Sequence, residues 1–519
     1  MGWFAAPQPL LPALVSHHGR WRGARTALVA GAQRLTWAEL DRESAQIANG
    51  LAASGLARGA RIAVLMDNSL ELAVLLFGIL RSGCVAVPLN VSISDAAVAG
   101  LIEDAAAAAI FASGRHCQRI EALAGLSRAV AAAQRFAHEG PGGAWRDLNA
   151  WRAAQPAHAP RVAIAPEDEC NIIYSSGTTG LPKGIVHTHA CRLNWARDCA
   201  VALRYRSDCV TLCSLGLFSN ISWVSMLATA FVGGTIVVML AFEPRATARL
   251  IESERITHGN FVPLQLERLL ALPDLERFRL ESLDTLMCCG SPLPLEVKRE
   301  FPRRTGCSLI ELYGLTEGVC TILAPEDFAT KMDSVGKPFL GTELLILGED
   351  DRELPPGATG EIVGYSPLLM QGYHRRDEAS LEATWTDPAG RRWLRTGDLG
   401  MLDADGFLYV VDRKKDMILS GAQNIYPADI EQVMRTHPDV IEVAVVAARS
   451  RKWGETPVAF VVARGGSRRD REELMQWTNA RVGRQQRIAD VLWRDSLPRN
   501  ANGKILKREL RAALGNTEY

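Results

Sequence analysis

The longest stretch without a formal charge decides first what this chain can fold into. It runs from Cys209 to Phe242, and at 34 residues it exceeds the roughly 20 apolar residues that a membrane-spanning helix needs. Serine and asparagine side chains interrupt its first half, and the pair Gly233-Gly234 precedes the β-branched stretch 235–239. Because such a stretch is typical of a fully buried parallel strand, we expect a helix, a glycine break and a strand in a globular domain, without a membrane span.

Helical and strand patterns alternate along most of the chain before this run and after it. Residues 37–56 carry apolar side chains at helical spacing, 61–66 form an apolar strand pattern, and 69–82 are again helical. The cycles cover 27–82, 96–112, 172–242 and 256–311. Such alternation predicts mostly parallel α/β sheets. We expect the Ala- and Gly-rich stretch 121–144 to lie at the surface.

Beyond about residue 335, short strand patterns separated by turn signals replace the alternation. The strand pattern 343–347, the Pro-Pro-Gly turn at 355–357 and the hairpin turn at 403–406 predict an antiparallel, barrel-like β subdomain. After the charged string 412–416, two helical and two strand patterns between 428 and 481 predict a compact α+β domain.

The expected fold is therefore α/β and has two domains. The large N-terminal domain, 1–412, combines mostly parallel α/β subdomains with the barrel-like β subdomain. The small, mobile α+β domain, 413–519, follows it.

Charge and cysteine usage exclude several classes of protein. The 58 Lys and Arg residues balance 58 Asp and Glu residues, which argues against nucleic-acid binding, because such binding depends on clustered positive charge. All eleven cysteines lie between Cys84 and Cys320, without a CxxC pair or a histidine-containing cluster. We therefore expect reduced, structural thiols in a cytoplasmic protein, and no targeting signal is recognisable at the N-terminus.

The most informative segment for function is the loop Tyr174-Ser-Ser-Gly-Thr-Thr-Gly-Leu-Pro-Lys-Gly184, which follows an apolar strand. Its glycines allow sharp turns that present backbone N–H groups, its hydroxyls add donors, and its lysine adds a positive charge. Such a loop is suited to cradling phosphates. It is not a Walker loop, because Pro182 stands where that motif requires glycine. His187 and His189, just beyond it, are too few for a metal site.

Together with four further motifs in a fixed order, this loop resembles the superfamily of adenylate-forming enzymes over about residues 30–515. This superfamily includes acyl-CoA synthetases, the adenylation domains of peptide synthetases, and luciferases. The further motifs are Tyr313-Gly-Leu-Thr-Glu317, Arg395-Thr-Gly-Asp-Leu-Gly400, Val411-Asp-Arg-Lys-Lys-Asp416 leading to Tyr426-Pro-Ala-Asp-Ile-Glu431, and Leu497-Pro-Arg-Asn-Ala-Asn-Gly-Lys504. Five motifs in one order are far more specific than any one of them.

The resemblance implies a two-step reaction. A carboxylate attacks the α-phosphate of ATP, pyrophosphate leaves, and a thiol then displaces AMP from the acyl-adenylate; such chemistry depends on positioning and charge neutralisation. Three residues are expected to be catalytic: Lys504 would reach the carboxylate and the α-phosphate, Glu317 would hold Mg²⁺, and Thr178 would lie near the phosphates. ATP, Mg²⁺ and CoA are the expected cofactors and co-substrates.

The same resemblance implies a set of nucleotide-binding residues. Tyr313 would stack on the adenine, and Asp398 would accept hydrogen bonds from the ribose hydroxyls with Arg413 beside it. The remaining members are Ser175, Ser176, Gly177, Thr179, Gly180 and Lys183 in the loop, Gly290, Ser291 and Pro292 in a turn along the nucleotide, and Gly314 and Thr316.

For the thiol step, the superfamily rotates its C-terminal domain about a hinge, which Lys415 matches. Gly421 and Ala422 would then line the pantetheine arm, although many relatives have a second glycine where this chain has Ala422. Trp453 is expected to pack on the CoA arm and Arg487 to pair with its phosphates, with core packing and solvation as equally open alternatives.

The acyl pocket is expected to contain Phe218, Ser219 and Trp223. Relatives that activate amino acids usually carry an Asp at the position of Ser219, and burying an ammonium group without a counter-charge costs several kcal/mol, which disfavours an amino-acid substrate. Many acyl- and aryl-CoA synthetases have a His there, so Ser219 departs from both patterns. The apolar neighbours fit either a fatty or an aromatic acid.

We therefore predict an AMP-forming acid:CoA ligase whose partners are a carboxylic acid, ATP and CoA, and we leave a homodimer open. The alternatives are an enzyme that stops at the adenylate or transfers the acyl group to a carrier-protein thiol, an oxidative luciferase-like enzyme, and a catalytically silent nucleotide-binding relative. The joint presence of Glu317, Asp398, Lys415 and Lys504 argues against the silent relative.

Overall fold

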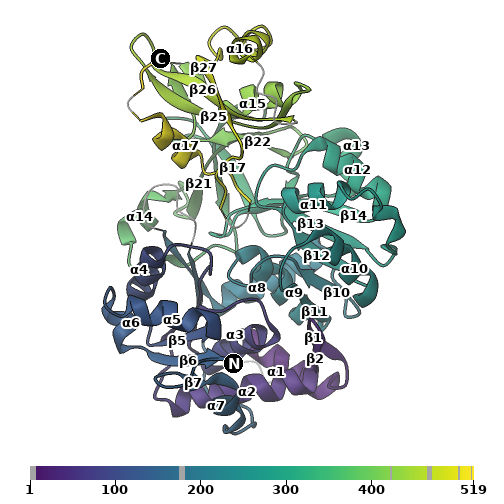
Figure 1. The fold of residues 1–519 in the computed structure, drawn as a ribbon, viewed down its shortest axis with the longest axis vertical. Coiled ribbons are helices and arrows are strands. Elements are labelled where there is room, and N and C mark those ends of the chain that lie inside the picture. Colours follow the sequence, from purple (N-terminus) through teal and green to yellow (C-terminus); the bar gives the residue numbers. More distant parts are fainter. Residues whose placement is uncertain (1–7, 175–181, 421–422, 465–469, 501–502, 516) are drawn as a thin grey trace. The chain divides into compact units, whose positions relative to one another are not determined.

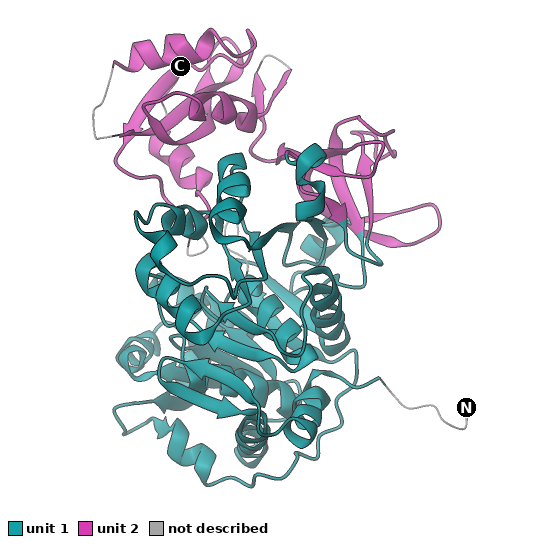
Figure 2. Cartoon of the chain, turned by 90° about the vertical axis from the view of Figure 1, so that its right-hand side faces the viewer, with its two compact units in different colours: residues 1–332, 338–342, 365–384 teal, residues 333–337, 343–364, 385–519 magenta. Residues whose placement is uncertain are grey.

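The computed structural model describes residues 8–174, 182–420, 423–464, 470–500, 503–515 and 517–519. The chain forms two compact units (Figure 2). Unit 1 consists of 1–332, 338–342 and 365–384, and unit 2 of 333–337, 343–364 and 385–519. The domain boundary at 412–413 and the hinge at Lys415 stay predictions.

An eight-stranded sheet in unit 1 has the order β19-β9-β8-β4-β3-β5-β6-β7. Its strands are β3 (Arg61–Leu65), β4 (Val85–Pro88), β5 (Ala109–Ser113), β6 (Gln134–His138), β7 (Arg146–Asp147), β8 (Glu169–Tyr174), β9 (Gly184–Thr188) and β19 (Gly372–Tyr373). Strands β5, β6 and β7 are labelled in Figure 1. The pairs from β8 through β7 are parallel, whereas β9 is antiparallel to both β8 and β19. The sheet is therefore mostly parallel, as the alternating pattern predicted.

Five of the eight described helices that accompany this sheet begin at an N-cap side chain that accepts a backbone hydrogen bond. The eight helices are α1 (Leu11–Trp21), α2 (Trp37–Ala53), α3 (Leu70–Ser82), α4 (Asp95–Ala105), α5 (Gly114–Leu123), α6 (Arg128–Ala132), α7 (Leu148–Ala153) and α14 (Asp377–Glu382). Thr36 and Glu39 form a capping box at the start of α2. Helix α3 starts after the N-cap Ser69 and ends at Gly83, whose φ of 72° favours glycine.

The expectation that residues 121–144 lie at the surface is wrong for the strand β6. Phe136 in β6 is fully buried and stacks on Phe111 of β5 with the ring centroids 4.5 Å apart. The sequence of β6, Gln-Arg-Phe-Ala-His, contains no apolar run. Only its pairing with β5 makes it a strand, and local pattern does not reveal such pairing.

A nine-stranded sheet in the same unit has the order β16-β15-β14-β13-β12-β10-β11-β1-β2. Its strands are β1 (Thr26–Ala30), β2 (Gln33–Thr36), β10 (Val210–Cys213), β11 (Thr235–Val238), β12 (His258–Phe261), β13 (Thr285–Cys289), β14 (Ser308–Gly314), β15 (Cys320–Leu323) and β16 (Lys337–Pro338). The helices are α8 (His189–Ala202), α9 (Asn220–Val232), α10 (Pro244–Glu254), α11 (Pro263–Leu270), α12 (Leu295–Thr305) and α13 (Phe328–Lys331). The pairs from β1 through β14 are parallel.

The uncharged run contains the predicted helix, glycine break and buried strand, and it begins with a strand, Val210–Cys213, that the sequence analysis did not predict. It forms β10, then α9, which ends at Gly233 with a φ of 75°, and then β11, which is buried between β10 and β1. Among the described helices, none combines the length and the apolar character that crossing a membrane requires.

Unit 2 begins with the strands of a five-stranded sheet, which contains antiparallel pairs. The strands are β17 (Glu343–Leu347), β18 (Gly360–Tyr365), β20 (Thr384–Thr386), β21 (Arg392–Leu402) and β22 (Leu408–Arg413), in the order β17-β18-β21-β20 with β22 on β21. The predicted hairpin turn joins β21 to β22, where the backbone N–H of Phe407 donates to Asp403 Oδ1 at 2.9 Å.

The C-terminal part of unit 2 contains a second sheet with the order β24-β23-β26-β25, to which β27 adds in parallel. Its strands are β23 (Ile418–Ser420), β24 (Gln423–Ile425), β25 (Val440–Ser450), β26 (Gly454–Ala463) and β27 (Asp490–Arg494), and its helices are α15 (Pro427–Arg435), α16 (Arg471–Asn479) and α17 (Lys507–Leu514). The predicted fold class, α/β with a large N-terminal part and a small α+β C-terminal domain, is confirmed.

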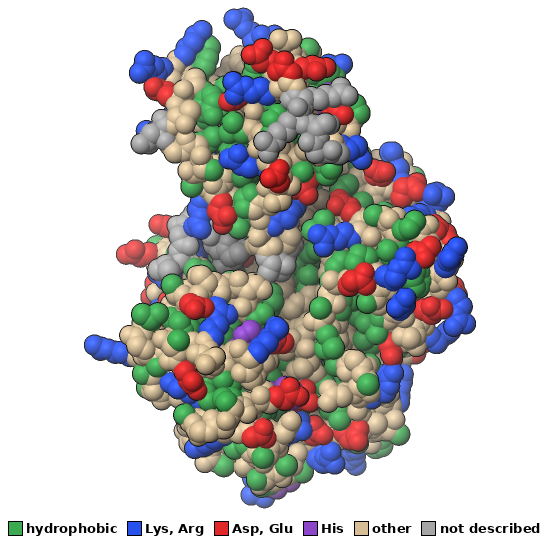
Figure 3. All heavy atoms as spheres, viewed as in Figure 1, with side chains coloured by type: hydrophobic (Ala, Val, Ile, Leu, Met, Phe, Trp, Pro, Cys, Tyr) green, Lys and Arg blue, Asp and Glu red, His purple; other side chains and the backbone are tan. Residues whose placement is uncertain are grey.

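The structure agrees with the prediction of reduced, structural thiols. All eleven cysteines are buried and unbonded to one another. On the face shown in Figure 3, described Lys and Arg side chains are interspersed with Asp and Glu side chains.

Candidate active site

The predicted phosphate loop joins two antiparallel strands, β8 and β9. Ser175, Ser176, Gly177, Thr178, Thr179 and Gly180 lie outside the described residues, so their roles stay predictions. Lys183, at the end of the loop, is described. Its Nζ lies 4.6 Å from the centroid of the Tyr373 ring.

Tyr373 links the loop lysine to the predicted metal ligand. It lies in β19, opposite Ile185 of β9, and its hydroxyl donates to Glu317 Oε1 at 3.0 Å. Burial, reinforced by the Glu317 carboxylate, raises the pKa of Tyr373. The sequence analysis missed Tyr373, because a two-residue strand so far from the loop leaves no local signal.

Glu317 suits a magnesium ion that arrives with ATP. No group of three or more His, Cys, Asp or Glu side chains in the described part of the chain is arranged to hold a metal. Mg²⁺ is commonly bound through one or two carboxylates together with substrate phosphates. The single carboxylate of Glu317, fixed by the Tyr373 hydroxyl, fits that mode of binding.

Two further motifs lie at the carboxyl ends of neighbouring parallel strands, β14 and β13. Tyr313 is half-buried near the end of β14, followed by Gly314. A Cβ at Gly314 would lie 2.6 Å from Cys320 Sγ, so only glycine fits. Gly290, after β13, has a φ of 100° and starts the turn that continues with the half-buried Ser291 and the exposed Pro292.

A buried hydrogen-bond network holds the backbone carbonyl of Thr316 in place. His187 Nε2 lies 2.8 Å from the Thr316 carbonyl oxygen, and Arg192 donates to His187 Nδ1 at 3.2 Å. These contacts assign the imidazole proton to Nε2. Burial, with the Arg192 charge as the second cause, lowers the pKa of His187 well below its usual value, so the ring is neutral.

Arg192 is the centre of this network, and the sequence analysis missed it. Its guanidinium also donates to Asn171 Oδ1 at 2.7 Å and to Asn220 Oδ1 at 2.8 Å, and it lies 5.3 Å from the Trp223 ring centroid. The side chain is fully buried, and burial lowers its pKa to about 10. No carboxylate among the described residues forms an ion pair with it. Arg192 thereby connects the Thr316 motif to the first turn of α9.

Helix α9 begins at the predicted acyl pocket. Ser219 is its N-cap, yet the hydroxyl makes no capping bond and has no hydrogen-bond partner among the described residues. Trp223 is fully buried, and its Nε1–H donates to the Leu217 carbonyl at 2.7 Å. Phe218 is half-buried against Gly216, where a Cβ would lie 2.2 Å from the Phe218 ring. Their part in binding an acid stays a prediction.

In unit 2 the structure brings four predicted residues together. Asp398 of β21 lies opposite Arg413 of β22, with Arg413 Nε 3.0 Å from Asp398 Oδ1. Burial, with the charges of Arg413 and Lys415 as further causes, lowers the pKa of Lys504 to about 8, against the opposing effect of the Asp398 carboxylate. Burial and Arg413 likewise lower the pKa of Lys415 to about 8.

Local backbone structure holds Lys504 in this cluster. The Lys504 N–H donates to Asn500 Oδ1 at 2.9 Å, and the Asn500 N–H donates to the Lys504 carbonyl at 2.9 Å. Gly503 has a φ of 78°, which glycine adopts without strain. The turn therefore depends on the Asn and Gly of the motif.

The residues predicted for CoA are exposed or undescribed. Gly421 and Ala422 lie outside the described residues. Trp453 lies in the turn between β25 and β26, is 49% exposed and has Lys452 Nζ 4.8 Å from its ring centroid. Arg487 is exposed. Core packing of Trp453 is therefore excluded.

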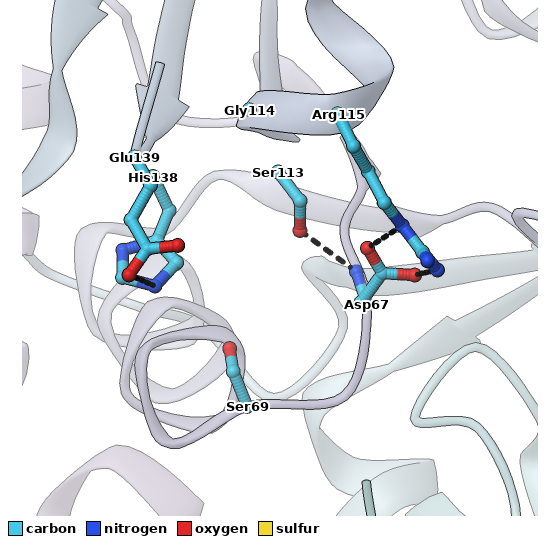
Figure 4. A pocket seen from close by; sticks show the side chains of 7 residues that line it. All are labelled: Asp67, Ser69, Ser113, Gly114, Arg115, His138 and Glu139. Atoms are coloured by element: carbon cyan, nitrogen blue, oxygen red, sulfur yellow. Dashed lines mark hydrogen bonds and ion pairs between the residues drawn. The ribbon is translucent and has the colours of Figure 1, made fainter. Parts of the chain in front are cut away.

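A separate pocket of about 250 Å³ opens at the carboxyl ends of β3, β5 and β6 (Figure 4). It is lined by Asp67, Ser69, Ser113, Gly114, Arg115, His138 and Glu139. Arg115 Nε donates to Asp67 at 2.6 Å, and His138 Nε2 faces Glu71 at 3.5 Å. Because both basic groups already face carboxylates, the pocket offers no unpaired cation to a ligand, and it contains no predicted site residue.

Comparison with known proteins agrees with this geometry. The AMP-binding enzyme family matches residues 15–374, and the AMP-binding enzyme C-terminal domain matches residues 429–504. A feruloyl-CoA synthase from Amycolatopsis is 34% identical over 94% of this chain and 96% of its own length. The fatty acid–[acyl-carrier-protein] ligase ScoC from Streptomyces coeruleorubidus is 32% identical over 97% and 96%.

A solved structure extends the likeness to three dimensions. The o-succinylbenzoate CoA synthetase MenE from Bacillus subtilis, in complex with its acyl-adenylate, is 28% identical, with a TM-score of 0.84 over 98% of this chain and 99% of that one. The chain belongs to the AMP-binding enzyme family. Within it, the chain is an acid–thiol ligase of the AMP-forming kind.

Proposed function

We propose that this protein is an ATP-dependent acid:CoA ligase that activates a fatty or aromatic acid as its acyl-adenylate and then transfers the acyl group to CoA. The cluster of Asp398, Arg413 and Lys504 is the observation that carries the proposal. It joins a carboxylate suited to ribose hydroxyls with a lysine suited to a developing negative charge. The relatives that act on CoA support the choice of thiol.

In the adenylation step, a carboxylate oxygen of the acid forms a bond to the α-phosphorus of ATP while pyrophosphate leaves. Lys504 would neutralise the charge shared by the carboxylate and the α-phosphate. Glu317, oriented by the Tyr373 hydroxyl, would hold Mg²⁺, which neutralises the phosphates when bound. Thr178, Thr316 and Lys183 would position the phosphates, and Tyr313 the adenine.

The acid would lie against the start of α9. The buried Ser219 carries no charge to pair with an α-ammonium group, so an amino acid would be bound with an uncompensated cation. The apolar Phe218 and Trp223 suit an aliphatic or an aromatic acyl group.

In the transfer step, the CoA thiolate attacks the acyl carbonyl and AMP leaves with the electrons of the broken carbon–oxygen bond. A rotation at the Lys415 hinge would exchange the Lys504 loop for the Gly421-Ala422 segment. The exposed Trp453 would pack on the CoA arm, and the exposed Arg487 would pair with its phosphates.

Acid-dependent ATP–pyrophosphate exchange without CoA tests this proposal across a panel of aliphatic, aromatic and dicarboxylic acids. Lys504→Ala is expected to reduce exchange at least about 100-fold, the usual effect of removing a transition-state charge contact. Lys507→Ala is the matched control, because Lys507, three residues away, pairs with Glu431 at 2.8 Å. Equal exchange in the two variants would contradict the role of Lys504.

A carrier-protein thiol is the second candidate acceptor, and the likeness to a ligase of that name favours it. AMP release after addition of CoA, or of a phosphopantetheinylated carrier protein, separates the two. Trp453→Ala should raise the KM for CoA if CoA is the acceptor and leave the carrier reaction nearly unchanged.

A further inference from the structure

Asn260 in β12 is a buried polar side chain that the fold leaves unsatisfied. It is fully buried, and neither its Nδ2 nor its Oδ1 has a hydrogen-bond partner among the described residues. A buried amide without partners lowers the stability of the folded state, and most buried polar groups in native proteins are paired. Asn171 is only partly comparable, because its Oδ1 accepts a bond from Arg192.

The side chain of Asn260 projects from the face of the sheet that carries α8 and α9. Side chains alternate along a strand, so Asn260 shares a face with His258, whose ring lies 4.8 Å from that of Tyr205. A Cβ at Gly259, on the opposite face, would instead approach Phe261 and Leu286. In register beside Asn260 lie Cys213 of β10 and Met287 of β13.

This position adjoins the proposed acyl pocket. Cys213, the register neighbour, has its Sγ 4.0 Å from the Ser222 carbonyl in the first turn of α9. Past the end of β12, Val262 and Ile221 of α9 both lie 3.4 Å from the position that a Cβ of Gly290 would take. Asn260 therefore lies where α9 and the carboxyl ends of β12 and β13 converge, the edge at which parallel sheets bind ligands.

We propose that the Asn260 amide recognises a hydrogen-bonding group on the acyl part of the substrate, so that the preferred acid carries a hydroxyl group. The inference rests on the proposed function and narrows its substrate class. A hydroxyl group matches the amide in both directions, because it donates to Oδ1 and accepts from Nδ2. A plain hydrocarbon chain would leave both amide groups unpaired and is disfavoured for that reason.

Paired acids that differ by one hydroxyl test the substrate preference in the exchange assay. Cinnamic acid with 4-hydroxycinnamic acid, and octanoic acid with 8-hydroxyoctanoic acid, sample an aromatic and an aliphatic skeleton. The wild-type kcat/KM is expected to favour the hydroxylated member of at least one pair by 10-fold or more, and Asn260→Leu and Asn260→Ala to reduce this ratio to near 1. A wild-type ratio near 1 in both pairs, or a ratio unchanged in both variants, would overturn the inference.

Asn479→Leu is the control for replacing a hydrogen-bonded, half-buried amide. Asn479 in α16 has a satisfied amide, which donates to the Ile488 carbonyl at 3.0 Å and accepts from the Ile488 N–H at 2.8 Å. The Tm of the ligand-free protein is expected to rise or stay unchanged in Asn260→Leu and to fall in Asn479→Leu. A fall of similar size in both would show that the fold satisfies Asn260 and would overturn the inference.

These readouts separate the two proposals. Absence of exchange with every acid of the wider panel contradicts the proposed function, whereas the Tm comparison, which needs no substrate, still decides whether the Asn260 amide is unpaired. Exchange with an unaltered hydroxyl ratio contradicts the Asn260 inference alone.

Discussion

Two regions of unit 1 each bury an arginine, and the fold treats the two cations differently. Arg81 of α3 pairs with the Asp41 carboxylate at 2.7 Å and donates to Ser44 and Ser16, so it joins α1, α2 and α3. Arg192 of α8 is also fully buried but has amide, imidazole and aromatic neighbours and no described carboxylate partner.

The difference separates a structural cation from one placed for function. A buried charge is costly unless it is paired, and the Arg81 region meets that requirement within the fold. Arg192 contacts Asn220 of α9 and, through His187, the Thr316 carbonyl, and it has no carboxylate partner among the described residues there. We expect such incomplete pairing to indicate a functional region.

The sharpest test of this comparison substitutes each arginine by glutamine. Arg192→Gln is expected to lower the kcat of exchange about 100-fold, because small displacements of Thr316 and α9 misalign the reacting groups. Arg81→Gln should leave kcat per folded molecule nearly unchanged but reduce the unfolding free energy by about 1–3 kcal/mol, since the buried Ser44 hydroxyl and the partly exposed Asp41 carboxylate lose their donor. Active-site titration gives kcat per folded molecule for both variants, and Arg192→Lys tests whether a positive charge alone restores it. Equal kcat values in Arg192→Gln and Arg81→Gln would contradict the comparison.

A second buried ion pair, between α12 and β14, belongs to the same comparison. Lys298 of α12 lies 2.6 Å from Glu311 Oε2, and burial raises the pKa of Glu311. Lys298→Met is expected to cost about 3–5 kcal/mol of unfolding free energy, because it leaves a buried carboxylate unpaired.

Denaturant unfolding measures this loss, and the double variant Lys298→Met with Glu311→Met should recover most of it. If the double variant is less stable than Lys298→Met, the loss of stability does not come from an unpaired Glu311 carboxylate, and the prediction is contradicted.

The Lys504 cluster predicts a pH dependence. With pKa values near 8, Lys504 and Lys415 lose their charge as pH rises through 8, so exchange should fall about 10-fold per pH unit above that value. Lys504→Arg should retain exchange at pH 9 relative to pH 7, because arginine stays charged. The same alkaline decline in Lys504→Arg would assign it to another group.

The contribution of Lys504 to stability is expected to change with pH in the opposite direction to the activity. Lys504 titrates near pH 8 in the folded protein but near its ordinary value of 10.5 in the unfolded chain, which therefore binds more protons between these values. Its contribution to the unfolding free energy thus increases from pH 8 to pH 10.5. Lys504→Gln is expected to remove this increase in thermal melts recorded across that window.

The smallest predicted effect concerns the Tyr373 hydroxyl. Tyr373→Phe keeps the ring beneath Lys183 but removes the bond to Glu317. We expect the Mg²⁺ concentration for half-maximal exchange to rise about 3- to 10-fold, in keeping with the loss of one hydrogen bond to a charged group. An unchanged Mg²⁺ dependence would separate Tyr373 from the metal.

Much of the fold was predictable because it follows from local patterns. The helical spacing of 37–56 and 69–82 and the break at Gly233 are read from single residues and their spacing. Strand β6 was not predictable, because its one buried aromatic, Phe136, gains its partner from another strand. Among the candidate site residues, those in motifs were found, whereas Arg192, Tyr373 and Asn260 were not. Each of these three lies outside a motif, and contacts with residues distant in the sequence define its environment.

The sequence by itself determined the family, the order of the elements and the adenylate-forming motifs. Each motif is a short stretch of glycines, hydroxyls and charged residues, so it can be recognised without knowledge of the tertiary structure. Only the tertiary structure decided that Tyr373 holds Glu317 and that, among the described residues, the buried Arg192 has no carboxylate partner and the Asn260 amide no hydrogen-bond partner. Burial and pairing depend on which strands and helices pack against one another. Whether a polar side chain is buried and unpaired therefore cannot be read from its neighbours in the sequence.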